Sequence, residues 1–130
     1  MSHWATVKAE ITDMDALEDA LKKMGYKNIK RNAEARGWSD SKKCDLVVVG
    51  KDRFDIGFQM RESGCNIVGD FSMMDVDEET FRDNVSQNYA YVMTMQGLQA
   101  KGLMAIQEHV EADGTIKLVV NLGNRYDEVN

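Results

Sequence analysis

Hydrophobic and polar positions alternate along the first segment of the chain, over residues 3–11. One side of it carries Ala5, Val7, Ala9 and Ile11, and the other side carries Trp4, Thr6, Lys8 and Glu10. A period of two residues is that of a β-strand with one buried face. The pattern therefore predicts a strand over residues 3–11.

A helical pattern follows this strand. Apolar residues recur at intervals of three and four, at Met14, Leu17, Leu21 and Met24. Thr12 stands three residues before Asp15, a spacing similar to a capping box, and Gly25 is a residue type that often follows a helix. We expect an amphipathic helix of about three turns.

The segment from residue 26 to residue 43 is less regular. Residues 26–31 can form a short strand. Residues 32–43 contain Gly37, two serines and several charged residues, a composition typical of a polar loop. Loops of this length are more often functional or mobile than simple connections. We therefore expect contacts with other molecules to be made here.

Three short runs rich in β-branched and aromatic residues come next, at residues 46–49, 54–60 and 65–71. The first run is apolar on both faces, and the other two alternate. Turn-forming residues at 50–52 and 63–64 separate them. The runs predict an antiparallel meander whose first strand is central.

A long helix is predicted from Asp75 to Lys101. Asp75 and Glu78 have the spacing of a helix start, and Gly102 can end the helix. Its inward stripe combines Phe81, Val85, Val92 and Met95 with Asn88, Gln96 and Gln99, with Tyr89 and Tyr91 flanking it on opposite sides. The stripe is therefore apolar with polar interruptions.

The last elements form a predicted β-hairpin. A three-residue loop at residues 112–114, with Gly114 in a left-handed bulge position, places nearly all apolar side chains on one face. The pairs in this register are Val110–Ile116, Glu108–Leu118, Ile106–Val120 and Met104–Leu122. We expect residues 123–130 to be a frayed polar tail.

The order of these elements predicts an α+β fold. Two helices would cover one face of a largely antiparallel sheet, in a plait-like plan that ends in a C-terminal β-hairpin. A chain of 130 residues without proline, internal repeats or a low-complexity segment is expected to form a single domain over residues 1–130.

Cysteine usage and hydropathy bear on the compartment. Cys44 and Cys65 stand alone, which leaves neither a disulfide framework nor a zinc ribbon and fits a reducing compartment. No stretch approaches a membrane span, and the N-terminus lacks the features of a signal peptide. We expect a soluble, cytoplasmic protein without a membrane partner.

Charge is distributed unevenly along the chain. Residues 22–61 hold 11 of the 16 Lys and Arg but only five of the 22 acidic residues. The basic segment 27–43 includes Lys27, Lys30, Arg31, Arg36, Lys42 and Lys43, with Tyr26 and Trp38 as the aromatic residues nearest to them. An acidic protein partner, the acidic half of a second copy, a nucleic acid and a plain solvated face all remain open here. A net charge of −6 disfavours nucleic acid.

A second candidate site lies at the hairpin. In the predicted register Glu108 points inward, where Asn88, Tyr89 and Gln99 of the long helix can meet it. Burying an unpaired carboxylate is costly, so the group is either a structural hydrogen-bond network or a ligand pocket in which Glu108 is an acid or base with a raised pKa.

The residues that enzymes use for catalysis do not form a motif. His3 and His109 are expected on opposite faces, which makes a poor metal site. No serine elbow, cysteine–histidine pair or glycine-rich phosphate loop is present in the sequence. We expect no metal, no cofactor and no catalytic residue.

Several segments together resemble a known family. They are residues 1–4 (MSHW), 21–26 (LKKMGY), 54–58 (FDIGF), 87–91 (QNYAY) and 113–116 (DGTI). In the same order, they are similar to a family of small hypothetical proteins of cyanobacteria and red-algal plastids, described as a domain of unknown function. Trp4 stands where that family commonly has phenylalanine. The resemblance implies a photosynthetic lineage, or a virus that infects one, and implies no activity.

The leading hypothesis is therefore a non-catalytic protein-binding or regulatory domain that self-associates or binds another protein. Its contact residues would be Arg36, Trp38, Lys42 and Lys43. The first alternative is a small-molecule-binding protein or enzyme that uses the polar cluster around Glu108. The second is nucleic-acid binding through residues 27–43.

Overall fold

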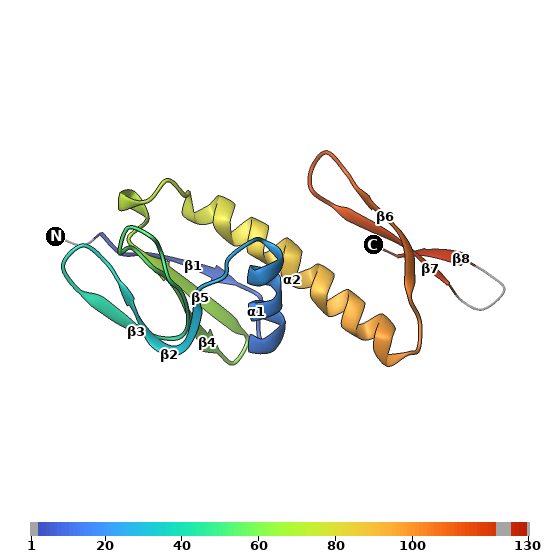
Figure 1. Cartoon of the computed structure of the whole chain (residues 1–130), viewed down its shortest axis with the longest axis horizontal. Helices are drawn as coiled ribbons and strands as arrows, with labels where there is room; N and C mark the ends of the chain where they lie inside the picture. Colours follow the sequence, from blue (N-terminus) through green and yellow to red (C-terminus); the bar gives the residue numbers. More distant parts are fainter. Residues whose placement is uncertain (1–2, 122–125, 130) are drawn as a thin grey trace.

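A computed structural model describes residues 3–121 and 126–129. A five-stranded sheet has both helices on one face, and a three-stranded C-terminal sheet lies against the far part of the long helix (Figure 1). The elements are β1 (Ala5–Ala9), α1 (Met14–Lys23), β2 (Ile29–Arg36), β3 (Ser41–Val48), β4 (Ile56–Arg61), β5 (Gly64–Gly69), a short 3-10 helix (Phe71–Met73), α2 (Glu78–Ala100), β6 (Ala105–Val110), β7 (Ile116–Asn121) and β8 (Tyr126–Val129). The predicted α+β class is confirmed.

The first strand and helix form where the periodicity predicts them. Ile11, Leu17 and Leu21 are fully buried on the faces that the sequence assigns to the core. The helix cap differs from the prediction. Asp13, and not Thr12, caps α1, because its Oδ1 accepts a hydrogen bond of 3.0 Å from the N–H of Ala16.

The main sheet has the strand order β1-β5-β4-β3-β2, and all its neighbours are antiparallel. The chain therefore returns from the β2–β5 meander to pair β5 with β1. Strand β3 lies inside the sheet, between β2 and β4, while β4 occupies its centre. The main core forms between this sheet and the two helices, with Leu17, Phe58, Ile67, Phe81 and Val85 among its buried residues.

The prediction of a long polar loop over residues 32–43 is wrong. These residues complete strands β2 and β3, and only residues 37–40 form the turn, where the N–H of Gly37 donates to Asp40 O at 2.8 Å. Charged residues alternate with small ones here, and Ala35 and Cys44 are buried. The strand period was missed because alanine is a weak hydrophobic signal among so many charges.

Hairpin β2–β3 bends over the second face of the sheet. Leu46 and Val48 pack beneath the helices, whereas Ala35 and Cys44 pack with Val47 and Val68 of the opposite face. The bend lies between the Arg31–Leu46 and Ala33–Cys44 pairs, where Asn32 has a φ of 50°. That left-handed backbone turns the outer half of the hairpin across the sheet.

Gly57 in β4 shows how closely the two layers meet. A Cβ at this position would lie 2.3 Å from Cys44 Sγ and 3.1 Å from the Cβ of Ala35. Only glycine fits beneath the bent hairpin without displacing it. The bend therefore carries residues 36–41 to the edge of the β3–β4 connection, where the N–H of Asp55 donates to Arg36 O at 3.0 Å.

Helix α2 begins later than predicted. Asp77, and not Asp75, is the N-cap, since its side chain accepts a hydrogen bond of 3.0 Å from the N–H of Thr80. Two sides of this helix are buried. Phe81, Val85 and Tyr89 join the main core, whereas Leu98 packs against the C-terminal sheet with Tyr91 and Met95 partly buried beside it.

The C-terminal sheet has the order β6-β7-β8. The predicted pairs Val110–Ile116 and Glu108–Leu118 are confirmed, as is the left-handed Gly114, with a φ of 91°. The predicted Ile106–Val120 pair is wrong, because a bulge between Ala105 and Gln107 pairs Ala105 with Val120.

The predicted Met104–Leu122 pair involves a residue outside the described part of the chain. Within the predicted frayed tail, Tyr126–Val129 form β8 and pair with β7, from Leu118–Val129 to Asn121–Tyr126. The sequence signal for this strand is weak because Asp127 and Glu128 interrupt its short apolar pattern.

Candidate functional site

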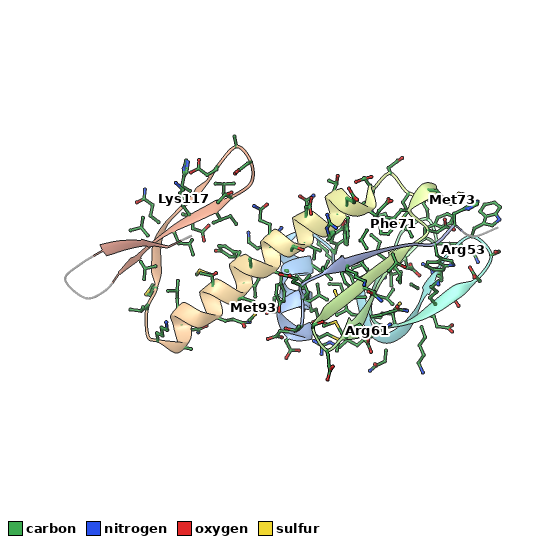
Figure 2. All side chains as sticks on the ribbon, turned by 180° about the vertical axis from the view of Figure 1, so that it is seen from behind. Arg53, Arg61, Phe71, Met73, Met93 and Lys117 are labelled. Atoms are coloured by element: carbon green, nitrogen blue, oxygen red, sulfur yellow. The ribbon has the colours of Figure 1, made fainter. Side chains whose placement is uncertain are left out.

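Arg36 and Trp38, two of the predicted contact residues, lie at the tip of hairpin β2–β3. A shallow hollow of about 520 Å³ forms there, lined by residues 36–41 and 52–54. We call these lining residues the tip surface. Figure 2 shows Arg53 and Met73 at this end of the molecule, far from the C-terminal sheet that carries Lys117.

An ion pair fixes one side of the tip surface. Arg36 Nε and Nη2 donate to the two carboxylate oxygens of Asp55 at 2.8 and 2.9 Å. The same carboxylate accepts hydrogen bonds from the N–H groups of Arg36 and Gly50. Burial raises the pKa of Asp55, but the bonds from Arg36 and Gly50 outweigh it and leave that pKa below its usual value.

A buried carboxylate fixes the other side. Asp70 follows β5 and is fully buried. It accepts hydrogen bonds from the N–H of His3 at 3.2 Å, the N–H of Trp38 at 3.1 Å and the hydroxyl of Ser72 at 3.2 Å. Asp70 thus joins the N-terminal segment, the hairpin tip and the 3-10 helix at one point.

Trp38 itself is left in solvent. The residue is 58% exposed, although its backbone N–H donates to Asp70. The turn is further fixed by Trp4, whose Nε1 donates to Asp40 Oδ1 at 2.8 Å. Met73, three residues after Asp70 in the chain, is 43% exposed. Exposed apolar side chains therefore lie on, or next to, a turn whose backbone is held by hydrogen bonds.

The two predicted lysines flank the tip on β3. Lys42 Nζ lies 5.4 Å from the centre of the Trp4 ring, a cation–π contact. Lys43 is exposed, and its carbonyl accepts a hydrogen bond from Gln59. Elsewhere in the basic segment, Arg31 pairs with Asp15 and Glu18 of α1. Two of the six predicted cations, Arg31 and Arg36, are therefore neutralised internally.

The predicted polar cluster around Glu108 is not brought together. The hydroxyl of Tyr89 accepts hydrogen bonds from the N–H groups of Thr12 and Asp13, in the main body. Asn88 donates to the carbonyl of Asn84 within its own helix, and Gln99 is exposed. Tyr89, Asn88 and Gln99 therefore have different surroundings, and they do not line one pocket with Glu108.

Glu108 does face α2, as predicted, but it is exposed. It accepts a hydrogen bond from the hydroxyl of Tyr91, which raises the pKa of Tyr91. His109 lies on the other face of β6, with its side chain 70% exposed and Nε2 3.8 Å from Glu111 Oε2. Glu108 and His109 border a shallow depression on the hairpin that residues of α2 do not line.

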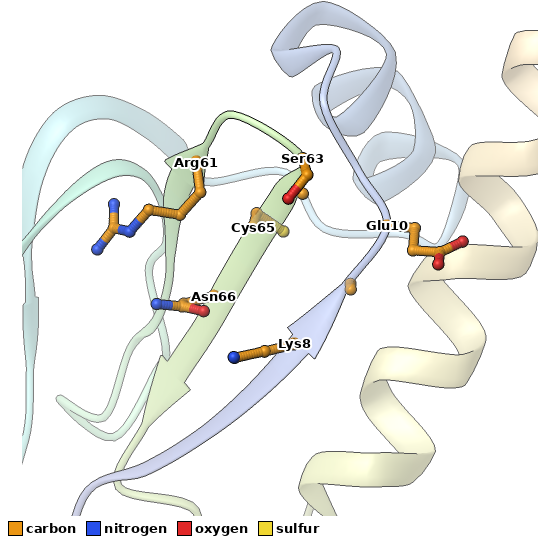
Figure 3. Close-up of a pocket in the computed structure, with 8 residues that line it drawn as sticks. Lys8, Glu10, Arg61, Ser63, Cys65 and Asn66 are labelled. Atoms are coloured by element: carbon orange, nitrogen blue, oxygen red, sulfur yellow. The ribbon is translucent and has the colours of Figure 1, made fainter.

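A further hollow, which the sequence did not indicate, lies on the open face of the main sheet. It has a volume of about 560 Å³ and is lined by residues 8–10, 61 and 63–66. Figure 3 shows Lys8, Arg61 and Asn66 on the same side of the sheet, with Glu10 directed away from them. Arg61 and Asn66 come from the consecutive strands β4 and β5, whereas Lys8 comes from the distant strand β1, so no sequence motif joins all three.

Neither cysteine is arranged as a nucleophile. Cys65 borders the hollow on the open face, and burial raises the pKa of its thiol to about 11. Burial likewise raises the pKa of Cys44, in the second core. Both thiols are therefore protonated at neutral pH. Within the described part of the chain, no three His, Cys, Asp or Glu side chains gather closely enough to hold a metal ion.

Comparison with known proteins places the chain in a family. A family model described as "Protein of unknown function (DUF1257)" matches residues 20–119, which include the tip surface and most of hairpin β6–β7. The chain belongs to this family. The description of the family names no activity. The resemblance of the sequence to small hypothetical plastid proteins is confirmed.

Individual relatives match over nearly their whole length. The uncharacterized protein ycf35 of Cyanophora paradoxa is 30% identical over 128 residues, covering 92% of this chain and 96% of the relative. The protein of the same name from Pyropia yezoensis is 27% identical over 127 residues, covering 95% and 99%. That of Guillardia theta is 26% identical over 123 residues.

No solved structure was found to match this DUF1257 chain. In the described residues, neither helix has the length and apolar character that crossing a membrane requires.

Proposed function

We propose that this protein is a non-catalytic binding module that docks another protein on its tip surface. The observation that carries the proposal is Trp38, which is 58% exposed while its backbone N–H donates to the buried carboxylate of Asp70. Tryptophan is one of the residue types enriched among the few residues that dominate the binding energy of protein interfaces. An ordered loop also loses little conformational entropy when a partner arrives.

The chemistry around Trp38 favours a partner that combines an apolar pocket with carboxylates. The pocket would receive Trp38, with Met73 at its border. Carboxylates of the partner would face Lys42, Lys43 and Arg53, which are cationic residues on or next to the tip surface, while Asp40 and Asp52 of the same lining would face neutral or basic groups. Electrostatic attraction of this kind increases the association rate and selects the partner, while the indole supplies the affinity.

Two observations support a protein partner over the alternatives. Arg31 and Arg36 already pair with carboxylates of this chain, which weakens the case for binding a phosphate backbone. Asn88, Tyr89 and Gln99 contact groups other than Glu108 or face solvent, which weakens the case for a small-molecule site in that cluster.

Site-specific photocrosslinking tests the proposal. A benzophenone amino acid would replace Asp52, an exposed lining residue of the tip surface, in one variant and Met93 in another, so that Trp38 is kept in both. Met93 is 39% exposed on α2, remote from the tip, and so serves as the matched control. In an extract of a photosynthetic cell, we expect a discrete adduct from position 52, competed by unlabelled protein but not by the Trp38→Ala variant. No adduct at position 52, or the same adduct at both positions, would contradict the proposal.

Self-association is the specific form of this function in which a second copy is the partner. Seventeen of the 22 acidic residues lie outside residues 22–61, so another copy offers the required carboxylates. Analytical ultracentrifugation at low and high salt should then show a dimer that dissociates as salt increases. A monomer at all concentrations would exclude the second copy and leave a different protein as the partner.

The relatives suggest where such a partner would be found. Cyanophora paradoxa, Pyropia yezoensis and Guillardia theta are the organisms of the three matching proteins. We propose a plastid, or the cytoplasm of a cyanobacterium, as the compartment in which the protein acts. The reducing character that its two free, buried cysteines suggest is compatible with either place.

A further inference from the structure

A recessed apolar hollow lies on the helix side of the main sheet, away from Trp38. It has a volume of about 680 Å³, within the range of small-molecule sites. Its walls come from the end of α1, from the β3–β4 connection and from the segment before α2. Tyr26, Val48, Ile56, Met74 and Val76 give it an apolar lining.

Only cations provide charge in this lining. Lys27 and Lys51 are its two charged residues, and in the described part of the chain neither forms an ion pair. Four acids, Asp52, Asp55, Asp75 and Asp77, are next to lining residues along the chain, and none of them lines the hollow. An apolar space with two unpaired ammonium groups therefore stands open to solvent.

We propose that this hollow binds a free amphiphilic anion, which has an apolar chain or ring and one carboxylate, sulfonate or phosphate head. The apolar part would displace water from Val48, Ile56 and Met74, which supplies most of the affinity. The head would lie between Lys27 and Lys51, which selects an anion over a neutral or cationic molecule of the same shape.

The occupant is a free molecule and not the headgroup of a membrane lipid. The hollow is recessed among α1, β3 and β4, and a bilayer surface would meet the flanking exposed side chains before its headgroups reached the apolar floor. The inference does not depend on the proposed protein-binding function, because Trp38 does not line this hollow.

Calorimetric titration with laurate, below its micelle concentration, provides the first test. We expect saturable binding at one site, with no binding of dodecyltrimethylammonium, which has the same chain and a cationic head. The double variant Lys27→Gln, Lys51→Gln should weaken laurate binding by about tenfold, since each exposed ionic contact contributes a modest factor. Trp38→Ala should bind laurate like the unchanged protein, so a failure here is distinct from a failure at the tip.

Two further measurements locate the ligand and its source. In ¹H–¹⁵N spectra, laurate should shift the amides of residues 25–28, 48–51 and 74–76 and leave those of residues 61–66 unchanged. Sedimentation with phosphatidylglycerol vesicles should show no more binding than with phosphatidylcholine vesicles.

Several results would overturn the inference. They are an absence of saturable laurate binding, equal binding of the cationic amphiphile, and unchanged affinity in a double lysine variant whose circular dichroism shows it to be folded. Preferential sedimentation with the anionic vesicles would also overturn it, because the ligand would then be a membrane surface.

Discussion

Asp55 joins the hairpin tip to the β3–β4 connection. Its buried carboxylate receives hydrogen bonds from Arg36 and Gly50 on two different segments. Replacing Asp55 by alanine leaves these donors unsatisfied beside an uncompensated guanidinium. We expect Asp55→Ala to lower the free energy of unfolding by about 3 kcal/mol in urea denaturation. Asp52→Ala, on the same loop but exposed, is the control and should change it by less than about 0.5 kcal/mol.

The pH dependence of that difference follows from the lowered pKa of Asp55. A carboxyl whose pKa is lower in the folded than in the unfolded protein stabilises the fold above its unfolded value of about 3.9. This contribution is lost as the pH falls through the lower pKa of the folded protein. The stability difference between wild type and Asp55→Ala should therefore be constant from pH 7 to about pH 5 and shrink only below about pH 4. A difference that disappeared between pH 7 and pH 5 would contradict the assigned pairing.

Gly114 and Gly97 give a second test at the level of single residues. Gly114 has a φ of 91°, and a Cβ there would lie 2.6 Å from Gln87 Oε1. Gly97 lies inside α2, where an added Cβ meets nothing within 4 Å. In thermal unfolding, Gly114→Ala should destabilise the protein by about 1 kcal/mol, whereas Gly97→Ala should stabilise it by about 0.5 to 1 kcal/mol. If Gly114→Ala stabilised the protein as Gly97→Ala does, the left-handed hairpin loop would have been assigned incorrectly.

Among the elements, hairpin β2–β3 has the most consequences for function, and Asn32 determines its path. A regular strand at this position would favour a β-branched residue. The observed φ of 50° instead favours glycine or asparagine. We expect Asn32→Val to destabilise the protein by about 1 to 2 kcal/mol in urea denaturation, with Asn32→Gly close to neutral. Stabilisation by valine would mean that the hairpin is straight and does not fold over the second face.

The elements that the sequence predicted well are those whose apolar residues have one clear period. In strand β1 and helix α1, the residues that periodicity assigns to the core are buried or packed against it, and Gly114 marks the hairpin turn. The predicted loop over residues 32–43 failed because its inward side chains, such as Ala35, are small. The bulge between Ala105 and Gln107 was not predicted, because the regular register and the bulged register give a similar apolar pattern along the strand.

The site was predictable only in part, for a different reason. Composition identified Arg36 and Trp38 as contact candidates, but their supports lie far away in sequence. Asp55 is 19 residues from Arg36, and Asp70 is 32 residues from Trp38. Such pairings depend on the strand order and on the bend at Asn32, neither of which leaves a local pattern. The expected cluster at Glu108 likewise depended on which side of α2 each polar residue occupies.

At the scale of the whole molecule, the two proposed contacts share one connection. The β3–β4 segment lines the tip surface with Asp52 and Arg53 and lines the apolar hollow with Gly50 and Lys51, while Phe54 borders both. Helix α2 separates this end of the molecule from the C-terminal sheet (Figure 1). Binding at either site is therefore expected to leave the C-terminal sheet unchanged.

The central claim is that the tip surface is ordered before any partner binds. Amide hydrogen exchange of the isolated protein, resolved by residue, tests this most directly. Gly37 and Trp38 donate their N–H groups to Asp40 O and to the buried Asp70, so both should exchange much more slowly than in an unstructured peptide. In an Asp70→Asn variant, the protection of the Trp38 amide should decrease, whereas the amides of the β4–β5 ladder should stay protected. Exchange of residues 37–40 at the rate of a free peptide, with β4 and β5 protected, would contradict the account.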